Sequence, residues 1–151
     1  MLKSTLWFGC LTTAFLAAAS LTSAQQAATP AENPLAHARS FQESEAPART
    51  AANGAIGRSF LNGTLVTGEV VGVHSTLQPA GTVPTPIHTI AHSEVIVVIE
   101  GTVTFDHDGL TDTAGPGSVL YVMPGTQHRL RNTSSGAVKY VVVQIGGDTK
   151  K

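Results

Sequence analysis

The chain has 151 residues, of which 42% are hydrophobic and 13% are charged, and its formal net charge is −1. This length suits one domain, and this composition supports a buried core rather than global disorder. Lys and Arg number 9 against 10 Asp and Glu. The chain therefore lacks the positive excess that neutralises a phosphate backbone, and nucleic-acid binding is not expected.

The first 24 residues have the pattern of a secretory signal peptide. Lys3 supplies a positive charge, residues 6–21 are apolar or small, and Thr22-Ser23-Ala24 resembles a cleavage site. An uncleaved membrane anchor is the rival interpretation, which the short and Ala-rich apolar stretch disfavours. We expect a periplasmic or extracellular protein without a membrane partner after cleavage. The one cysteine, Cys10, lies in this leader, so the mature chain would have no disulfide and no thiol nucleophile.

Residues 25–56 are rich in Ala, Pro, Gln and Glu and sustain no apolar period. This composition is typical of a flexible linker, so we expect an N-terminal tail ahead of the folded body. The body is expected at 57–147, with a short C-terminal tail at 148–151.

The body has the pattern of an all-β domain. Val, Ile and Thr become dense, and turn residues recur every eight to twelve positions, which favours a sandwich or barrel. Asp106-His107-Asp108-Gly109 between two apolar runs predicts a hairpin. Strands are expected at Thr64 to Val66, Glu69 to Leu77, Ile87 to Ile90, Val95 to Glu100, Thr102 to Asp106, Ser118 to Met123, His128 to Asn132 and Val138 to Ile145.

Two of the expected strands, 95–100 and 138–145, are apolar on both faces. A half-exposed strand should alternate with polar residues, so the outer face of these strands needs a cover. A homodimer interface is the simplest cover, and the chain's own N-terminal tail is the alternative. Tyr121 and Met123 are expected in the core.

Three potential metal ligands lie close together in the segment PIHTIAHSEVIVVIEG, namely His88, His92 and Glu94, and His128 follows later. Neutral imidazoles and a carboxylate suit Fe, Mn, Ni, Cu or Zn. Residues 88, 92 and 94 share parity, so they would face one side of an extended strand, although a turn near His92 would shift that phase. His74 is expected to face a cavity or an interface.

Around these residues the chain resembles a single-domain cupin of the type-2, RmlC-like superfamily. The first motif of that family, G-x5-H-x-H-x3-E-x6-G, is matched by Gly81, His88, Glu94 and Gly101, with one extra residue after the first Gly. The second, G-x5-P-x-G-x2-H-x3-N, is matched by Gly117, Gly125, His128 and Asn132, with Met123 in place of Pro. The resemblance implies a small double-stranded β-helix, or jelly-roll barrel.

The chain departs from the family at one ligand, because Ile90 occupies the position of the second His. The resemblance implies metal ligation by the remaining three residues, His88, Glu94 and His128. The alternative is a relic site in which these groups line a polar cavity and pair with one another. His92 could serve as a catalytic acid or base, substitute as a ligand, or cap the turn.

Three functions remain open at this stage. The first is a metal-dependent enzyme, an oxygenase or an isomerase, acting on a small molecule in the barrel. The second is a non-catalytic module that binds a sugar or an aromatic ligand beside a degenerate metal site. The third is a structural or metal-storage role. The fold cannot decide among them, because this barrel hosts many unrelated activities.

Overall fold

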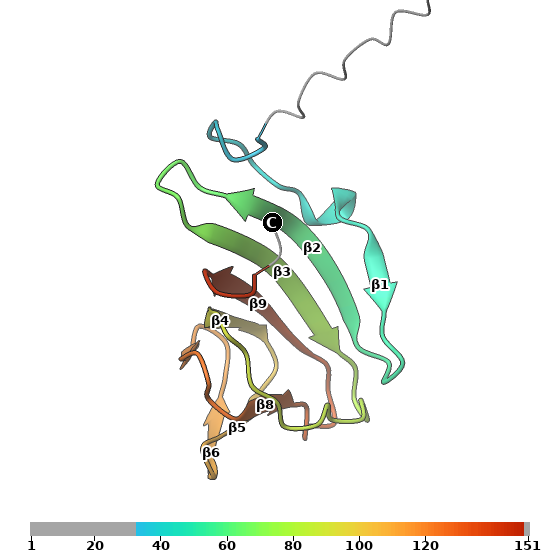
Figure 1. Ribbon diagram of the computed structural model, residues 1–151. Helices are drawn as coiled ribbons and strands as arrows, with labels where there is room; N and C mark the ends of the chain where they lie inside the picture. Colours follow the sequence, from blue (N-terminus) through green and yellow to red (C-terminus); the bar gives the residue numbers. More distant parts are fainter. Residues whose placement is uncertain (1–32, 150–151) are drawn as a thin grey trace, which may run out of the picture. The chain divides into compact units, whose positions relative to one another are not determined.

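The computed structural model describes residues 33–149, which form nine β-strands and one turn of 3-10 helix, η1 (Glu43–Glu45) (Figure 1). The all-β prediction is confirmed. The expected signal peptide and Cys10 lie outside the described residues. The strands are β1 (Ala48–Thr50), β2 (Ile56–Thr64), β3 (Val70–Gln78), β4 (Ser93–Glu100), β5 (Val103–His107), β6 (Leu110–Ala114), β7 (Val119–Val122), β8 (His128–Arg131) and β9 (Val138–Ile145).

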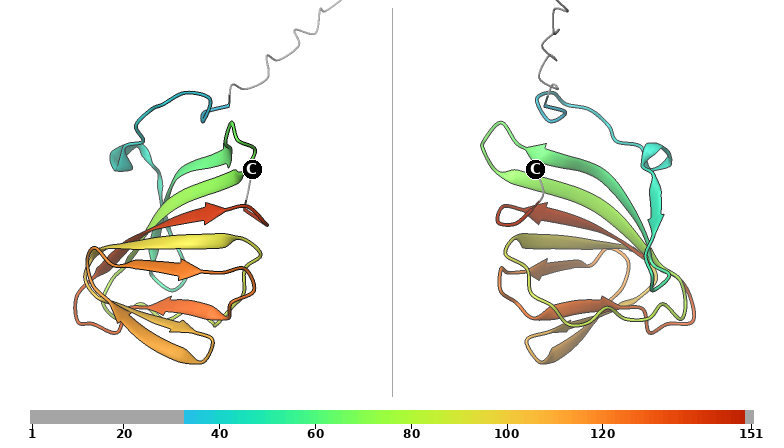
Figure 2. Two further views of the ribbon diagram at one scale, coloured as in Figure 1. Left: turned by 90° about the vertical axis from the view of Figure 1, so that its left-hand side faces the viewer. Right: turned by 45° about the vertical axis from the view of Figure 1, so that its right-hand side comes forward.

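The strands form two sheets that enclose the core. The larger sheet has the order β1-β2-β3-β9-β4-β7, and the smaller has the order β6-β5-β8. The last strand, β9, lies antiparallel between β3 and β4, so the two ends of the barrel sequence meet in one sheet. Figure 2 shows this arrangement, with the red β9 between the green β3 and the yellow β4.

Alternate residues of the central strands supply the core. On β4, Ile96 and Val98 are almost fully buried, whereas Val95 and Val97 point to the outer face and are half-buried. This alternation follows from the period of two in a strand. The core cluster consists of Ile96, Val98, Val103, Phe105, Ala114, Val122, Val138, Tyr140 and Val142.

Most strands predicted from the apolar pattern are present within two residues of their expected ends. The hairpin at 106–109 is also confirmed, with Asp108 and Gly109 both at positive φ between β5 and β6. The pattern missed β1, β2 and β6, in which polar or small residues interrupt the apolar ones. The strand expected at Thr64 to Val66 was wrong, because Thr64 ends β2 and the next two residues lead into the β2–β3 turn. It was wrong at Ile87 to Ile90, where only an isolated bridge pairs His88 with His128. Pro84 and Pro86 precede this segment and remove two backbone donors.

The described part of the expected linker, residues 33–56, carries η1 and β1. Strand β1 pairs with β2, and Arg58 of β2 donates to the carbonyl of Ala46. Glu43 forms an ion pair with the outward Lys139 of β9 at 2.7 Å. This part of the chain thus contacts one end of the outer face of the larger sheet. Among the described residues no helix is long and apolar enough to cross a membrane.

A contiguous apolar surface covers the rest of that outer face. Cross-strand pairing places Val95 beside Tyr121 and Val143, and Val97 beside Val119 and Val141. Val119 and Tyr121 are 63% and 61% exposed, and the four valines of β4 and β9 are half-buried. The expected core positions of Tyr121 and Met123 are therefore wrong, because Tyr121 has the outward phase of β7 and Met123 lies beyond the strand. We name the following set the outer apolar face: Val95, Val97, Ile99, Val119, Tyr121, Val141, Val143 and Ile145.

The tight turn between β4 and β5 requires a glycine at position 101. Gly101 has φ +72°, and an added Cβ would lie 2.3 Å from the carbonyl oxygen of Ala137. We expect Gly101→Ala to lower the free energy of unfolding by roughly 2–4 kcal/mol, because strain and a backbone clash add together. Gly117→Ala is the matched control, since Gly117 also has positive φ but no atom lies within 4 Å of its Cβ position. Urea unfolding of both variants gives the comparison, and equal losses would contradict the clash.

Candidate metal and ligand site in the barrel

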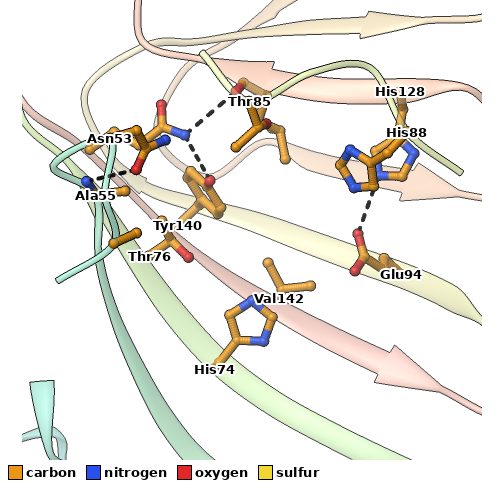
Figure 3. Close-up of a pocket in the computed structure, with 13 residues that line it drawn as sticks. Asn53, Ala55, His74, Thr76, Thr85, His88, Glu94, His128, Tyr140 and Val142 are labelled. Carbon is orange, nitrogen blue, oxygen red and sulfur yellow. Dashed lines mark hydrogen bonds and ion pairs between the residues drawn. The ribbon is translucent and has the colours of Figure 1, made fainter. Parts of the chain in front are cut away.

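A cavity of about 240 Å³ opens between the two sheets and holds three of the sequence-predicted site residues. Figure 3 shows Glu94, His88 and His128 together at one end and Asn53, Thr76 and Tyr140 toward the other. The remaining lining residues include His74, Gln78, Thr85, Leu130 and Val142. The β1–β2 turn, β3, β4, β8, β9 and the loop before β4 all contribute, so the cavity exists only in the closed barrel.

The imidazoles of His88 and His128 lie side by side, with ring centroids 4.6 Å apart. In each ring Nδ1 faces the backbone carbonyl oxygen two residues earlier, Pro86 O at 3.2 Å and Thr126 O at 3.1 Å. A carbonyl oxygen only accepts, so each Nδ1 must carry the proton. In the neutral rings the lone pair is then on Nε2, which is the tautomer that a metal-binding His takes when a backbone carbonyl orients it.

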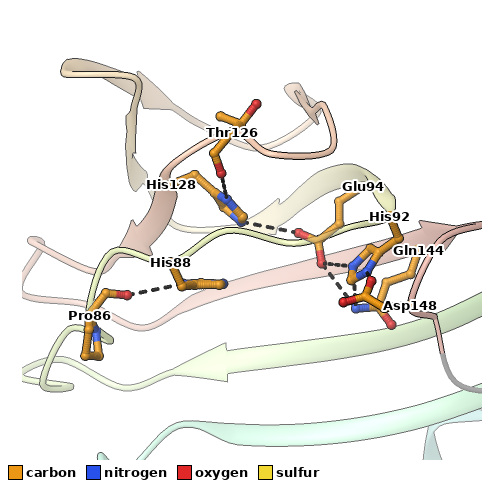
Figure 4. A network of polar contacts seen from close by, with 8 residues as sticks. All are labelled: Pro86, His88, His92, Glu94, Thr126, His128, Gln144 and Asp148. Atoms are coloured by element: carbon orange, nitrogen blue, oxygen red, sulfur yellow. Dashed lines mark hydrogen bonds and ion pairs between the residues drawn. The ribbon is translucent and has the colours of Figure 1, made fainter.

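Glu94 is the centre of a polar network in the barrel (Figure 4). One carboxylate oxygen, Oε1, contacts His92 Nε2 at 3.1 Å and accepts from Gln144 Nε2 at 3.2 Å. The other, Oε2, faces His128 Nε2 at 3.7 Å. The side chain of Glu94 is only 11% exposed, so these partners replace the water that the charge would otherwise need.

His92 does not line the cavity and lies behind Glu94. Its side chain is 7% exposed, and its Nδ1 contacts the carboxylate of Asp148, which follows β9. Each ring nitrogen of His92 thus faces a carboxylate, and only the protonated ring can donate to both. Burial opposes the charged ring, but the hydrogen bonds to Asp148 and Glu94 outweigh it and raise the pKa of His92.

The hydrogen-bond network shifts the pKa values of the residues around Glu94. Burial alone would raise the pKa of Glu94, but the nearby imidazole of His128 and the hydrogen bonds with His92 and Gln144 lower it to about 2. The contact with Glu94 raises the pKa of His128 although burial opposes it. Burial lowers the pKa of His74, on the opposite wall. Without metal the site therefore carries an ionised Glu94 flanked by imidazoles that favour protonation.

The far end of the cavity is uncharged and polar. Gln78 is 6% exposed and donates from Nε2 to the hydroxyl of Tyr140 at 3.0 Å. Burial raises the pKa of Tyr140 to about 12, so this hydroxyl keeps its proton. The Oε1 atom of Gln78 is buried and has no hydrogen-bond partner among the described residues. A free buried acceptor in a cavity wall calls for a donor from water or from a ligand.

Sequence reasoning brought together the correct region but missed two members of the network. Gln144 points inward, as Tyr140 and Val142 do. A polar residue among inward-facing apolar residues could have identified it as part of the site. Asp148 gave no signal, because a turn brings it back to His92. The common face expected for residues 88, 92 and 94 is not formed, because the chain bends at residues 91–92 before β4 begins: His88 and Glu94 line the cavity and His92 does not. Ile90 packs against the core cluster.

The donor set fits a divalent transition metal in its chemistry. His88, Glu94 and His128 offer two neutral imidazole nitrogens and one carboxylate oxygen, with backbone carbonyls fixing both tautomers. Among residues 33–149, however, no three His, Cys, Asp or Glu side chains are gathered closely enough to hold an ion as they stand. The ligand assignment from the sequence therefore stays a prediction, and a metal would have to draw these side chains together.

The buried carboxylate predicts an acid-dependent stability. Because the pKa of folded Glu94 is about 2 against an ordinary 4.5, its stabilisation is complete above about pH 4.5 and is lost as the pH falls toward 2. We expect Glu94→Gln to lower the free energy of unfolding by roughly 2–4 kcal/mol at pH 7, since it leaves buried partners unpaired. Urea titrations from pH 7 to 2 should show this difference shrinking below pH 4.5. Glu100→Gln, at an exposed position of the same strand, is the control. A difference that stays constant with pH would contradict the assignment.

Comparison with known proteins agrees with this architecture. The cupin-domain family model matches residues 73–144. An RmlC-like cupin from Shewanella frigidimarina superposes with a TM-score of 0.60 at 15% identity, covering 74% of this chain and 94% of that one. A predicted oxalate decarboxylase from Thermotoga maritima gives 0.58 at 15% identity (71% and 98% covered), and the polyketide cyclase RemF from Streptomyces resistomycificus gives 0.58 at 15% (76% and 88% covered). A search of curated proteins finds no match. Residues 73–144 therefore match the cupin domain, and the chain has the double-stranded β-helix fold of the RmlC-like cupins on which it superposes.

Proposed function

We propose that this protein binds a divalent transition metal through His88, Glu94 and His128 and a small molecule in the adjoining cavity, as a metal-dependent enzyme of the oxygenase or isomerase kind. The observation that carries the proposal is the orientation of the two imidazoles. Both direct Nε2 away from the backbone carbonyls that hold Nδ1, and His128 faces the Glu94 carboxylate. Enzymatic neighbours of the same fold, a polyketide cyclase among them, support the general class.

The cavity sets the size and polarity of the ligand. Its volume of about 240 Å³ suits a small molecule. Val142 and Leu130 supply apolar parts of the cavity wall. The free Oε1 of Gln78 calls for a hydroxyl or N–H donor on the ligand. A small hydroxylated or aromatic molecule meets these requirements.

The chain's own residues supply proton handling at the Glu94 end. A bound metal would add Lewis-acid polarisation of a ligand oxygen. His92 has no surface on the cavity, so its proposed acid–base role would reach a ligand only through Glu94 Oε1. The leader-like sequence supports export to the periplasm or beyond as the setting for this function.

A non-catalytic binding module is the second candidate, and two observations favour it. Ile90 replaces the second His of the family motif. Oε1 of Glu94 already has hydrogen bonds with His92 and Gln144, and Oε2 lies near His128, so the carboxylate has partners without an ion. In that case the same cavity would bind a sugar or an aromatic ligand without chemistry.

Metal content distinguishes the two candidates. We expect the full chain, purified without a His tag or chelator, to contain near-stoichiometric metal by elemental analysis. A His88→Ala/His128→Ala double variant should bind the preferred ion roughly 100-fold more weakly or not at all, since it loses both imidazole ligands. His107→Ala is the control, because His107 pairs with Asp112 outside this cavity. Ile90→His should raise the affinity by restoring the absent ligand.

The opposite result is equally clear. No metal in the wild-type chain, even after reconstitution with Fe, Mn, Ni, Cu and Zn, would contradict metal binding and favour the binding module. Thermal-shift screening of sugars and aromatic acids would then identify ligands of the cavity.

The outer apolar face supports the proposal that the protein is a homodimer. The N-terminal residues described here contact Arg58 and Lys139 at the β2–β3–β9 end of the sheet. Val119 and Tyr121 at the β7 end remain 63% and 61% exposed. Strands that are apolar on both faces are typical of a sheet covered by another layer, and a second copy provides that layer.

Substitutions that introduce charged side chains on the outer apolar face test the dimer proposal. We expect Val119→Lys/Tyr121→Lys to convert a wild-type dimer to a monomer in light scattering, because the lysines would be desolvated in the interface. Val66→Lys is the control, since Val66 is 82% exposed in the β2–β3 turn, away from this face. A monomeric wild-type protein would contradict the proposal.

A further inference from the structure

We propose that the turn Gly146–Asp148 is a positioning element for the site: Asp148 holds His92, and His92 holds one oxygen of Glu94, so that the other oxygen faces the cavity. This inference rests on the proposed function for its consequence in metal binding. Its structural part concerns this chain alone. Asp148 and His92 are positioning residues here, because neither lines the cavity.

The turn is fitted against the start of β4. Gly146 and Gly147 both have positive φ, and the N–H of Gly146 donates to Val70 O at 2.7 Å. A Cβ on Gly147 would lie 1.9 Å from Ala91 O and 2.8 Å from the Cα of His92. Only glycine allows this approach, and the approach brings the next residue, Asp148, to the His92 ring.

His92 is the link between an exposed carboxylate and a buried one. The Asp148 side chain is 56% exposed, so its charge costs little to keep. The His92 ring is buried between Asp148 at Nδ1 and Glu94 at Nε2. With both nitrogens engaged, the ring cannot turn about its Cβ–Cγ bond without losing two hydrogen bonds. The turn therefore fixes the orientation of His92.

The two oxygens of Glu94 are thereby given different partners. Oε1 is occupied by His92 and by Gln144, which also contacts His92 Nε2 at 3.1 Å. Oε2 faces His128 at 3.7 Å, beyond ordinary hydrogen-bond distance, and remains available. The carboxylate is thus prepared to offer a single oxygen to a ligand or an ion between the imidazoles. A carboxylate free to rotate would lose entropy in the same step.

The structural part is tested in the metal-free full chain by NMR. The probes are the side-chain carboxyl ¹³C shift of Glu94 and the ring nitrogens of His92, compared across matched variants. Asp148→Ala and Gly147→Ala should both move these signals. Asp112→Ala removes a similar His–Asp pair at His107, and Gly146→Ala adds a Cβ at positive φ where no atom lies within 4 Å. Both controls should leave the signals of Glu94 and His92 in place.

A conservative variant separates positioning from general loosening. The amide oxygen of Asp148→Asn can still accept from His92 Nδ1, so this variant should restore the signals toward wild type. In metal titration, Asp148→Ala should weaken affinity by about 10-fold, as for other groups that orient ligands, and Asp112→Ala should not. Asp148→Ala leaves the turn without a clash, so the test stands even if Gly147→Ala does not fold.

The results for the turn and for the metal can be told apart. Glu94 and His92 signals that move no more in Asp148→Ala than in Asp112→Ala would overturn the positioning role, whatever the metal result. A wild-type chain that takes no metal but shows the expected NMR differences would overturn the proposed metal binding and keep the turn as the element that orients Glu94.

Discussion

The burial of one carboxylate, Glu94, inside a small barrel is the constraint on which the site depends. A charge this far from water must be paired or hydrogen-bonded, and the chain provides partners from three separate places. His128 comes from β8, Gln144 from β9, and His92 from the bend before β4. The strand order that places β9 beside β4 is what brings Gln144 to this carboxylate. The carboxylate of Glu94 therefore gains its hydrogen-bond partners only when the barrel is closed.

The same network gives the buried carboxylate partners without metal, and it bears on the metal binding proposed above. Proton and metal compete for the same imidazole nitrogens, because a ring that donates from both nitrogens has no lone pair for an ion. The contact with Glu94 favours the protonated form of His128, so metal affinity should weaken in acid. The carbonyls of Pro86 and Thr126 keep the Nδ1 protons in both states. Exchange of proton for metal then requires no change of tautomer.

The two faces of the larger sheet differ in what they contact. The inner face packs Ile96, Val98 and Val142 against the smaller sheet and leaves the cavity at one end. The outer face is apolar at β4, β7 and β9, although water would favour polar side chains there. A dimer through this face would stiffen β4 and β9, which carry Glu94 and Gln144. Assembly and site geometry would then be coupled through two strands rather than through a separate element.

Much of the architecture was predictable from the sequence because it depends on local pattern. Runs of Val and Ile identified β4 and β9, and Asp108-Gly109 identified the β5–β6 hairpin. Strands β1, β2 and β6 were missed because they lie at or near sheet edges. Polar residues are tolerated there, so these strands lack a clear apolar pattern. Tyr121 was placed in the core because composition does not reveal phase when a strand is apolar on both sides.

The site divides in the same way. The resemblance to the two cupin motifs grouped Glu94 with His88 and His128, although the interval from Gly81 to His88 is one residue longer than in the motif. Only the tertiary structure brought Asp148 to His92, because that contact depends on a turn packing against a backbone more than fifty residues earlier. The tertiary structure also determines that one carboxylate oxygen of Glu94 is hydrogen-bonded and that the other faces the cavity. Spacing along a chain fixes which residues can meet, but the direction of a side chain depends on what packs behind it.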